Sequence, residues 1–178
     1  MTHPLDLFRH CPQCGRAGFA VNDERSKRCP HCGFTYYLNA SAANVAIIRN
    51  ARGELLVVRR GRNPQKGMLD LPGGFCDLQE TAEEGVRREV MEETGLRVQS
   101  VRYLLSRPNT YEYSGLTVHT VDLFFACEVE DGCEPRAMDD AAEVMWLRPE
   151  EINLEDFGFK SIREGLGEIL KNLPIYKV

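Results

Sequence analysis

"GFCDLQETAEEGVRREVMEETGL", residues 74–96, is the stretch of sequence that decides the fold. Thr81 is followed three residues later by Glu84, which is the spacing of a capping box at the start of a helix. Gly95 has the freedom to adopt the left-handed backbone conformation that commonly ends a helix. The sequence therefore predicts a helix over about residues 81–94.

Three carboxylates of this helix lie at the edge of its apolar face. At 100° per residue, Val86 and Val90 lie on an apolar stripe, Glu89 and Glu93 project within or beside it, and Glu92 lies on its flank. Anions so close to a core edge raise one another's pKa and destabilise the fold unless a positive charge lies among them. Clustered carboxylate oxygens are suitable ligands for Mg²⁺ or Mn²⁺.

A solvated acidic face paired with arginines is the alternative interpretation of these glutamates. Arg87 points well away from Glu89 and Glu93 on a helical projection, whereas Arg88 remains near Glu92. The spacing therefore favours a metal site over a simple charged surface.

The spacing within residues 74–96 resembles the Nudix box, the signature of the Nudix hydrolases. Nine positions match it: Gly74, Glu80, Arg88, Glu89, Val90, Glu92, Glu93, Gly95 and Leu96. The resemblance implies an α/β fold, a Nudix α/β/α sandwich with a mixed sheet, over residues 39–178. It also implies a Nudix pyrophosphohydrolase, an enzyme that hydrolyses the diphosphate linkage of a nucleoside diphosphate joined to another group.

The resemblance assigns roles to the acidic residues of the box. It implies that Glu89, Glu92 and Glu93 bind the catalytic Mg²⁺ or Mn²⁺, with Glu92 and Glu93 central to catalysis. It also implies that Glu80 and Arg88 form a supporting ion pair in the catalytic site.

Residues outside the helix complete the expected site. Gly73 and Gly74 would let the loop backbone approach the metal or the phosphates of the substrate. Glu143, three residues before Trp146, resembles the position of a further ligand or general base, with a strand-edge surface glutamate as the alternative. Two neighbouring carboxylates are weaker candidates for that role: Asp139 and Asp140.

The stretch "SRPNTYE", residues 106–112, corresponds to the specificity array of NADH pyrophosphatases. Ser106 matches that array and Tyr111 replaces its Phe, but its Trp and two of its prolines are absent. Substrates of the NADH, NAD⁺ or ADP-ribose type are therefore expected, without NADH being singled out. Tyr111 and Tyr113 could stack on a base or nicotinamide ring, or could pack across strands.

Four cysteines near the start of the chain have the spacing of metal ligands. Two Cys-x-x-Cys pairs separated by fourteen residues can each form a tight turn and together surround Zn²⁺ with four thiolates. A segment of this size buries too little apolar surface to fold alone, so residues 1–38 are predicted to be a small zinc ribbon with a structural metal. The predicted ligands are Cys11, Cys14, Cys29 and Cys32.

Zinc ribbons often bind nucleic acid or mediate assembly. A ligand-sensing regulator, or an RNA-cap hydrolase whose ribbon contacts nucleic acid, is therefore an alternative to the small-molecule enzyme. The intact box favours an enzyme, and a net charge of +2 over residues 1–38 is weak support for nucleic-acid binding. Similarity to NADH pyrophosphatases suggests a homodimer.

The rest of the chain is typical of a globular domain. Further strands are expected in residues 96–106, 116–130 and 143–148, and helices in 149–157 and 161–173. A hairpin is expected where "ANVAIIRN" and "GELLVVRR" are joined by a turn over residues 51–53. The sequence lacks a signal peptide or an apolar run long enough to cross a membrane, which leads us to expect a cytoplasmic protein.

Overall fold

The computed structural model describes residues 3–130 and 132–172 of the chain. It divides into two compact units, residues 1–40 with 110–119, and residues 41–109 with 120–178. The predicted boundary between residues 38 and 39 stays a prediction.

The first unit contains a small antiparallel sheet in the order β1-β2-β3. Its core is minimal: the rings of Phe19 and Phe34 stack with centroids 6.3 Å apart, next to the buried Cys11 and Cys29. So little apolar burial is consistent with a unit that depends on a bound metal for its stability. The three strands are β1 (Ala20–Asp23), β2 (Ser26–Arg28) and β3 (Thr35–Tyr37).

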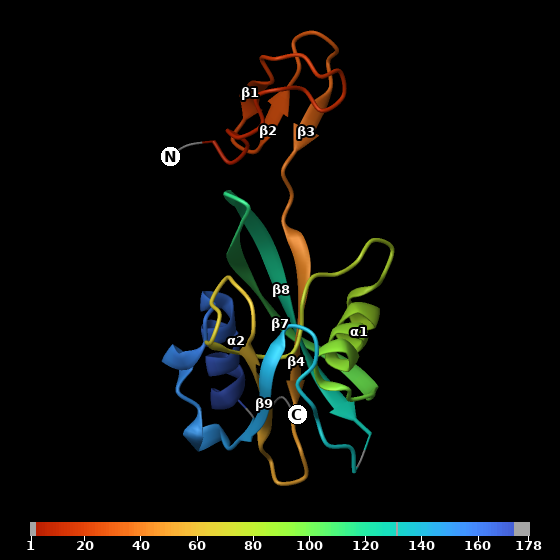
Figure 1. Cartoon of the computed structure of the whole chain (residues 1–178), viewed down its shortest axis with the longest axis vertical. Coiled ribbons are helices and arrows are strands. Elements are labelled where there is room, and N and C mark those ends of the chain that lie inside the picture. Colours follow the sequence, from red (N-terminus) through yellow and green to blue (C-terminus); the bar gives the residue numbers. More distant parts are fainter. Residues whose placement is uncertain (1–2, 131, 173–178) are drawn as a thin grey trace. The chain divides into compact units, whose positions relative to one another are not determined.

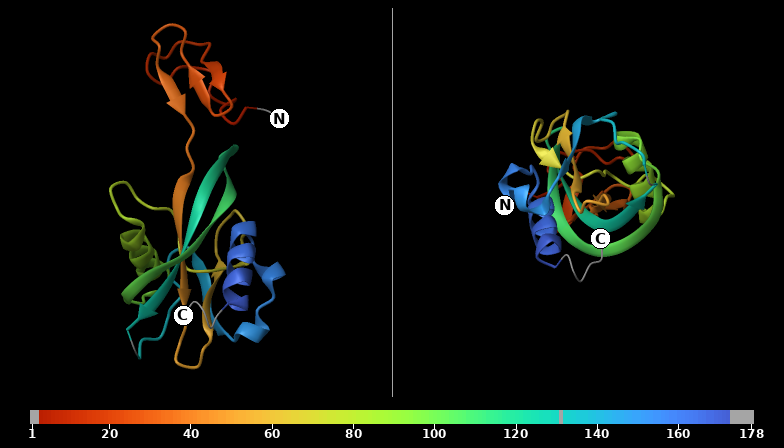
Figure 2. Two further views of the ribbon diagram at one scale, coloured as in Figure 1. Left: turned by 180° about the vertical axis from the view of Figure 1, so that it is seen from behind. Right: turned by 90° about the horizontal axis from the view of Figure 1, so that it is seen from below.

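The second unit has two three-stranded sheets in the orders β4-β8-β7 and β6-β5-β9. β4 pairs with β8 in parallel, whereas β5 pairs with β6 and β9 in antiparallel fashion. Figures 1 and 2 show α1 and α2 on opposite sides of the strands, which confirms the predicted α/β sandwich with mixed strand pairing. The elements are β4 (Ser41–Ile48), β5 (Leu55–Arg60), β6 (Leu69–Asp70), α1 (Ala82–Thr94), β7 (Val98–Tyr113), β8 (Leu116–Val129), β9 (Ala141–Leu147) and α2 (Lys160–Lys171).

Strand β4 divides its side chains between two cores, because successive residues of a strand point to opposite faces. Val45 and Ile47 belong to the cluster that packs against α2. Ala46 and Ile48 belong to the cluster that packs against α1. Burial on both faces explains why this stretch reads as a continuous apolar run.

Helix α1 forms as the sequence predicts. The Thr81 side chain accepts from the Glu84 backbone N–H, the Glu84 side chain accepts from the Thr81 backbone N–H, and Gly95 ends the helix at φ 69°. Val86 and Val90 are fully buried against the sheet, which fixes the rotation of the helix and therefore the direction of its glutamates.

Two local predictions are wrong. Strands β4 and β5 are connected only by a short turn with an isolated bridge between Arg49 and Leu55, because β4 pairs with β8 and with a loop instead. Residues 149–157 form two short 3₁₀ turns in place of one helix, Pro149–Glu151 and Leu154–Asp156. Among the described residues, no helix combines the length and apolar character needed to span a membrane.

Candidate functional site

The loop before α1 is attached to the edge of strand β4. The Ala46 N–H donates to the Pro72 carbonyl at 2.8 Å, and the Asn44 N–H donates to the Gly74 carbonyl at 2.7 Å. A bridge between Ala43 and Phe75 continues the same ladder. The backbone of this loop is therefore hydrogen-bonded to β4 in the way that a neighbouring strand would be.

Two consecutive glycines make this close approach possible. Gly73 has φ 152°, and a Cβ atom there would lie 2.0 Å from the Asn44 carbonyl oxygen. A Cβ atom on Gly74 would lie 2.6 Å from the carboxylate of Glu89. These two glycines therefore allow close contact with β4 and with a carboxylate of α1, and their approach to a metal or phosphate stays a prediction.

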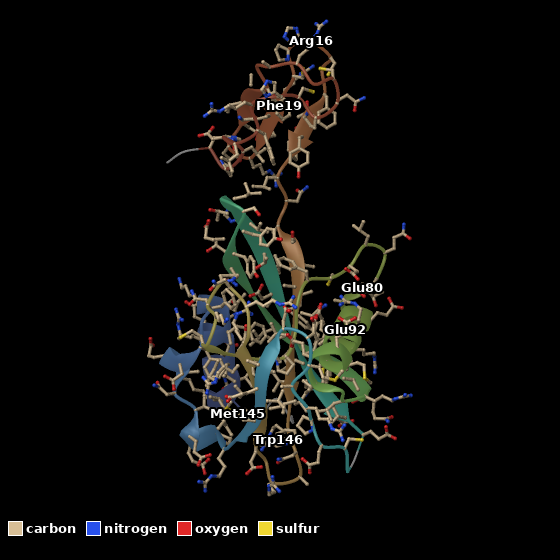
Figure 3. The ribbon with its side chains drawn as sticks, viewed as in Figure 1. Arg16, Phe19, Glu80, Glu92, Met145 and Trp146 are labelled. Atoms are coloured by element: carbon tan, nitrogen blue, oxygen red, sulfur yellow. The ribbon has the colours of Figure 1, made fainter. Side chains whose placement is uncertain are left out.

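Arg88 is the cation at the centre of the helix's acidic face. Its guanidinium lies 2.7 Å from Glu80, 2.9 Å from Glu89 and 3.0 Å from Glu92. It also donates to the Phe75 carbonyl at 3.0 Å, which ties the loop to the helix. Figure 3 labels Glu80 and Glu92 beside α1. The Arg88 hydrogen bond lowers the pKa of Glu80, so this carboxylate is ionised over a wide pH range.

Glu93 differs from the other box glutamates because it is buried and lacks a cation. Only 8% of the residue is exposed, and its Oε2 accepts from the Gly73 N–H at 3.0 Å. No Lys, Arg or His of the described residues lies within 4.0 Å of its carboxylate. Burial raises the pKa of Glu93 to about 8, and burial also raises the pKa of Glu89.

These carboxylates form a donor set suited to a hard divalent cation. Glu93 is removed from water with only one hydrogen-bond donor, so a bound cation would remove the cost of ionising it. In the part of the chain that the structure describes, no three acidic residues bring carboxylate oxygens within 4.8 Å of one another. The ligands are therefore gathered on one side of a helix, but they are not converged into a finished coordination shell.

Two residues that act electrostatically on Glu93 were not indicated by any sequence pattern. Asp70, at the end of β6, is 6% exposed, and its carboxylate lies 2.8 Å from the guanidinium of Arg60 at the end of β5. Burial raises the pKa of Asp70, and the Arg60 guanidinium opposes that effect. Both Asp70 and Arg60 act electrostatically on Glu93. Their proximity depends on the pairing of β5 with β6, which local sequence patterns do not reveal.

Asn44 is a further buried polar residue behind the loop. Its side chain donates to the Cys76 Sγ at 3.1 Å, while its Oδ1 is buried without a hydrogen-bond partner. The helix can approach Asn44 only because residue 85 is a glycine, where a Cβ atom would lie 2.4 Å from the Asn44 amide nitrogen.

Glu143 lies on β9 and forms an ion pair with an arginine of β5. It pairs with Arg59 at 2.7 Å across the β5–β9 ladder, and 58% of its side chain is exposed. Its neighbours Val144 and Trp146 face the core containing α1, so the alternation of β9 directs Glu143 to the opposite face. Its assignment as a ligand or base stays a prediction, which this geometry does not support. The rival carboxylates pair with Arg62: Asp139 and Asp140.

Three of the predicted substrate-binding residues lie on strand β7, which is longer than expected. Ser106 is half-buried within the strand. Tyr111 and Tyr113 are near its end, with ring centroids 6.5 Å apart at 34°, and Tyr113 is 64% exposed. The two tyrosines belong to the first unit and Ser106 to the second. Binding of substrate by these three residues stays a prediction.

The four cysteines of the first unit converge as predicted. The Sγ atoms of Cys11 and Cys32 are 3.7 Å apart, as are those of Cys14 and Cys29, and all four lie within 4.8 Å of one another. A tetrahedron with metal–sulfur distances of about 2.3 Å has edges of about 3.8 Å, so this spacing fits a Zn²⁺ ion.

The two cysteine turns share one backbone pattern. The Gly15 N–H donates to the Cys11 carbonyl at 2.8 Å, and the Gly33 N–H donates to the Cys29 carbonyl at 3.0 Å. The backbone N–H of Cys32 lowers the pKa of Cys29 to about 6, which favours the thiolate needed by a metal ligand.

Comparisons with known proteins agree with the fold and the box. The sequence model of the NUDIX domain matches residues 38–166. The chain is 30% identical over 167 residues to the "NAD-capped RNA hydrolase NudC" of Chromobacterium violaceum, covering 94% of this chain and 53% of that protein. For the protein of the same name in Haemophilus influenzae (strain PittGG), identity is 32% over 123 residues, 68% of this chain and 47% of that protein. The chain therefore spans about half the length of these curated relatives.

Two solved structures share the fold. A NUDIX hydrolase from Nitrosomonas europaea superposes with a TM-score of 0.71 at 24% identity, covering 92% of this chain and 91% of that one. The NUDIX domain of Shewanella oneidensis NrtR, complexed with ADP ribose, has a TM-score of 0.60 at 18% identity. The match covers 77% of this chain and 90% of that one. With the family model matching most of its length and the Nudix box seated on α1, the chain belongs to the Nudix family.

Proposed function

We propose that this protein is a metal-dependent pyrophosphohydrolase acting on a nucleoside diphosphate joined to another group. The observation that carries the proposal is Glu93, a buried carboxylate without a cation beside two further glutamates on the same helix. Nudix hydrolases use divalent metal ions, and the donor set here is entirely oxygen. We propose Mg²⁺ or Mn²⁺ as the ion.

A divalent ion at this position would neutralise the diphosphate and lower the pKa of a bound water for attack on phosphorus. The residues of this chain do the rest. Glu89, Glu92 and Glu93 bind the ion, while the Gly73 N–H holds the Glu93 carboxylate at 3.0 Å. Arg88 connects the loop to the helix, through Phe75 on one side and through Glu80 on the other.

We propose NADH, NAD⁺ or ADP-ribose type molecules as the substrate class. ADP ribose bound to the NrtR domain supports this choice, as does the name of the curated relatives, which places NAD at the end of an RNA. Tyr111 and Tyr113 are our candidates for stacking on a base or nicotinamide ring. A homodimer and a cytoplasmic location are further proposals.

NAD-capped RNA is the second candidate substrate, and the names of the relatives favour it specifically. In this case the first unit, with its proposed structural Zn²⁺, would contact the RNA body. The net charge of only +2 over residues 1–38 limits the electrostatic contribution to such binding.

One experiment tests the function and separates the substrates. The full chain is incubated with Mg²⁺ or Mn²⁺ and with NADH, NAD⁺, ADP-ribose, diadenosine polyphosphates, UDP-sugars or NAD-capped RNA, and the products are resolved by chromatography. Metal-dependent release of two mononucleotide-type products from a dinucleotide supports the proposal. Glu92→Gln combined with Glu93→Gln must abolish this release, and turnover that survives in that variant would falsify the metal assignment.

A further inference from the structure

Two arginines lie near the carboxylates of α1, and they are used differently. Arg88 contacts Glu80, Glu89 and Glu92 directly. Arg60 also acts electrostatically on Glu93, yet its guanidinium is bound to Asp70 and not to Glu93. The Nudix-box glutamate that makes no ion pair among the described residues is therefore within the electrostatic influence of a cation that is bound to another carboxylate.

Several contacts fix Arg60 in its position. Its Nη1 donates to Asp70 at 2.8 Å, and its Nε donates to the Pro64 carbonyl at 2.9 Å. Its guanidinium carbon lies 4.9 Å from the centre of the Phe159 ring. Only 19% of the side chain is exposed, so a guanidinium here needs an anionic partner.

Both carboxylate oxygens of Asp70 accept a hydrogen bond. One carboxylate oxygen accepts from the Leu71 N–H at 2.9 Å, and the other accepts from Arg60. Leu71 precedes Pro72 and Gly73, so the same short segment that positions Asp70 also delivers the N–H that holds Glu93. Asp70 already holds the guanidinium through a charged hydrogen bond of 2.8 Å, whereas Glu93 accepts from the Gly73 N–H.

We propose that Asp70 is a positioning residue, which keeps Arg60 away from Glu93 and thereby leaves the Glu93 carboxylate open to a divalent cation. The inference rests on the proposed metal dependence. Without the Asp70 charge, the largely buried guanidinium would lose its carboxylate partner, and it would compete with the metal for Glu93, which lies within its electrostatic range.

A role for Asp70 as a metal ligand makes a different prediction. If the Asp70 carboxylate bound the ion, its loss would weaken metal binding whatever residue stands at position 60. If Asp70 only restrains Arg60, removing both side chains would restore binding. A double-variant cycle separates the two roles.

The test measures binding of Mn²⁺ to the full, zinc-loaded chain by electron paramagnetic resonance, without any substrate. The four proteins are wild type, Asp70→Asn, Arg60→Met, and the double variant. We expect Asp70→Asn to weaken Mn²⁺ binding by at least about tenfold, a typical effect for a residue that orients metal ligands. We expect Arg60→Met alone to bind at least as tightly as wild type, and the double variant to return to within about threefold of wild type.

The inference is overturned if Asp70→Asn binds Mn²⁺ like wild type, or if the double variant stays as weak as Asp70→Asn. Circular dichroism melts establish that each variant is folded. If Asp70→Asn does not fold, Arg60→Met decides alone: unchanged or tighter binding supports the inference, and tenfold weaker binding overturns it. Absence of Mn²⁺ binding by wild type overturns the proposed function as well, so the two failures are distinguishable.

Discussion

The cysteine cluster of the first unit and the glutamate cluster of the second are both suited to bind a metal. The cysteines form a complete set of ligands, whereas the glutamates do not. The thiols already lie at the edge lengths of a tetrahedron, 3.7 Å apart in two pairs, on two turns of the same design. The glutamates are spread along one helix, with Arg88 among them and Glu93 buried alone. A closed set of ligands stabilises a fold, whereas an incomplete one leaves positions for water and substrate.

Loss of one thiol should break the first site completely. Cys29→Ser removes a ligand from a unit with very little apolar core, so we expect bound zinc to fall from about one equivalent to near zero. Zinc released on thiol modification, together with limited proteolysis of residues 1–40, measures the effect. Cys133→Ser, which replaces an exposed cysteine outside the cluster, is the control. Freshly purified wild-type protein without zinc would contradict the assignment of these four cysteines.

In the second site we expect the buried glutamate to matter most for turnover. Glu93→Gln should lower metal-dependent kcat by roughly 10²- to 10³-fold, because a neutral amide cannot hold the ion against the diphosphate. Steady-state hydrolysis of the best substrate in the panel measures this. Glu83→Gln, on the exposed part of the same helix, should leave the rate unchanged. Equal losses in the two variants would mean that Glu93 has no special role.

The free energy of unfolding should depend on pH because Glu93 is buried. Its pKa is about 8 in the folded protein, above the ordinary glutamate value of 4.5, so the folded chain binds more protons than the unfolded chain between these values. The free energy of unfolding should therefore fall by about 2 to 4 kcal/mol between pH 5 and pH 8 when divalent ions are absent.

Urea denaturation in buffer passed over a chelating resin, at several pH values, measures this decline. The Glu93→Gln variant should show a much flatter dependence, because it lacks the group that titrates. Parallel pH profiles for wild type and variant would show that Glu93 titrates normally.

The smallest expected effect concerns Arg88. Arg88→Met removes the cation shared by Glu80, Glu89 and Glu92, which should reduce the free energy of unfolding by about 1 to 2 kcal/mol without divalent ions. Saturating Mn²⁺ should shrink that difference, because the ion then neutralises Glu89 and Glu92. Arg87→Met is the matched control: Arg87 donates to the Val98 carbonyl, so its stability loss should not respond to Mn²⁺.

The parts of this molecule that local sequence determines were predictable. The capping box at Thr81, the stop at Gly95 and the doubled Cys-x-x-Cys spacing each act within a few residues, and the structure contains all three. The single helix predicted over residues 149–157 was wrong, because the proline and acidic residues that start a helix also suit a short 3₁₀ turn.

Contacts between distant segments were not predictable from one sequence. The hairpin of β4 and β5 failed because the edges of β4 are taken by β8 and by the loop around Gly74. Asp70 and Arg60 meet only through the β5–β6 register. Alternation along β9, with Val144 and Trp146 apolar, contained the information that Glu143 faces away from α1.

Arg88 gives the glutamate site an internal counter-ion. With its guanidinium already between Glu89 and Glu92, the acidic face is never a bare cluster of negative charge. At the proposed metal site, entry of a divalent ion would then be an exchange of partners, in which one cation replaces another beside Glu89 and Glu92. The dependence of metal affinity on ionic strength should accordingly be weaker than the number of carboxylates suggests.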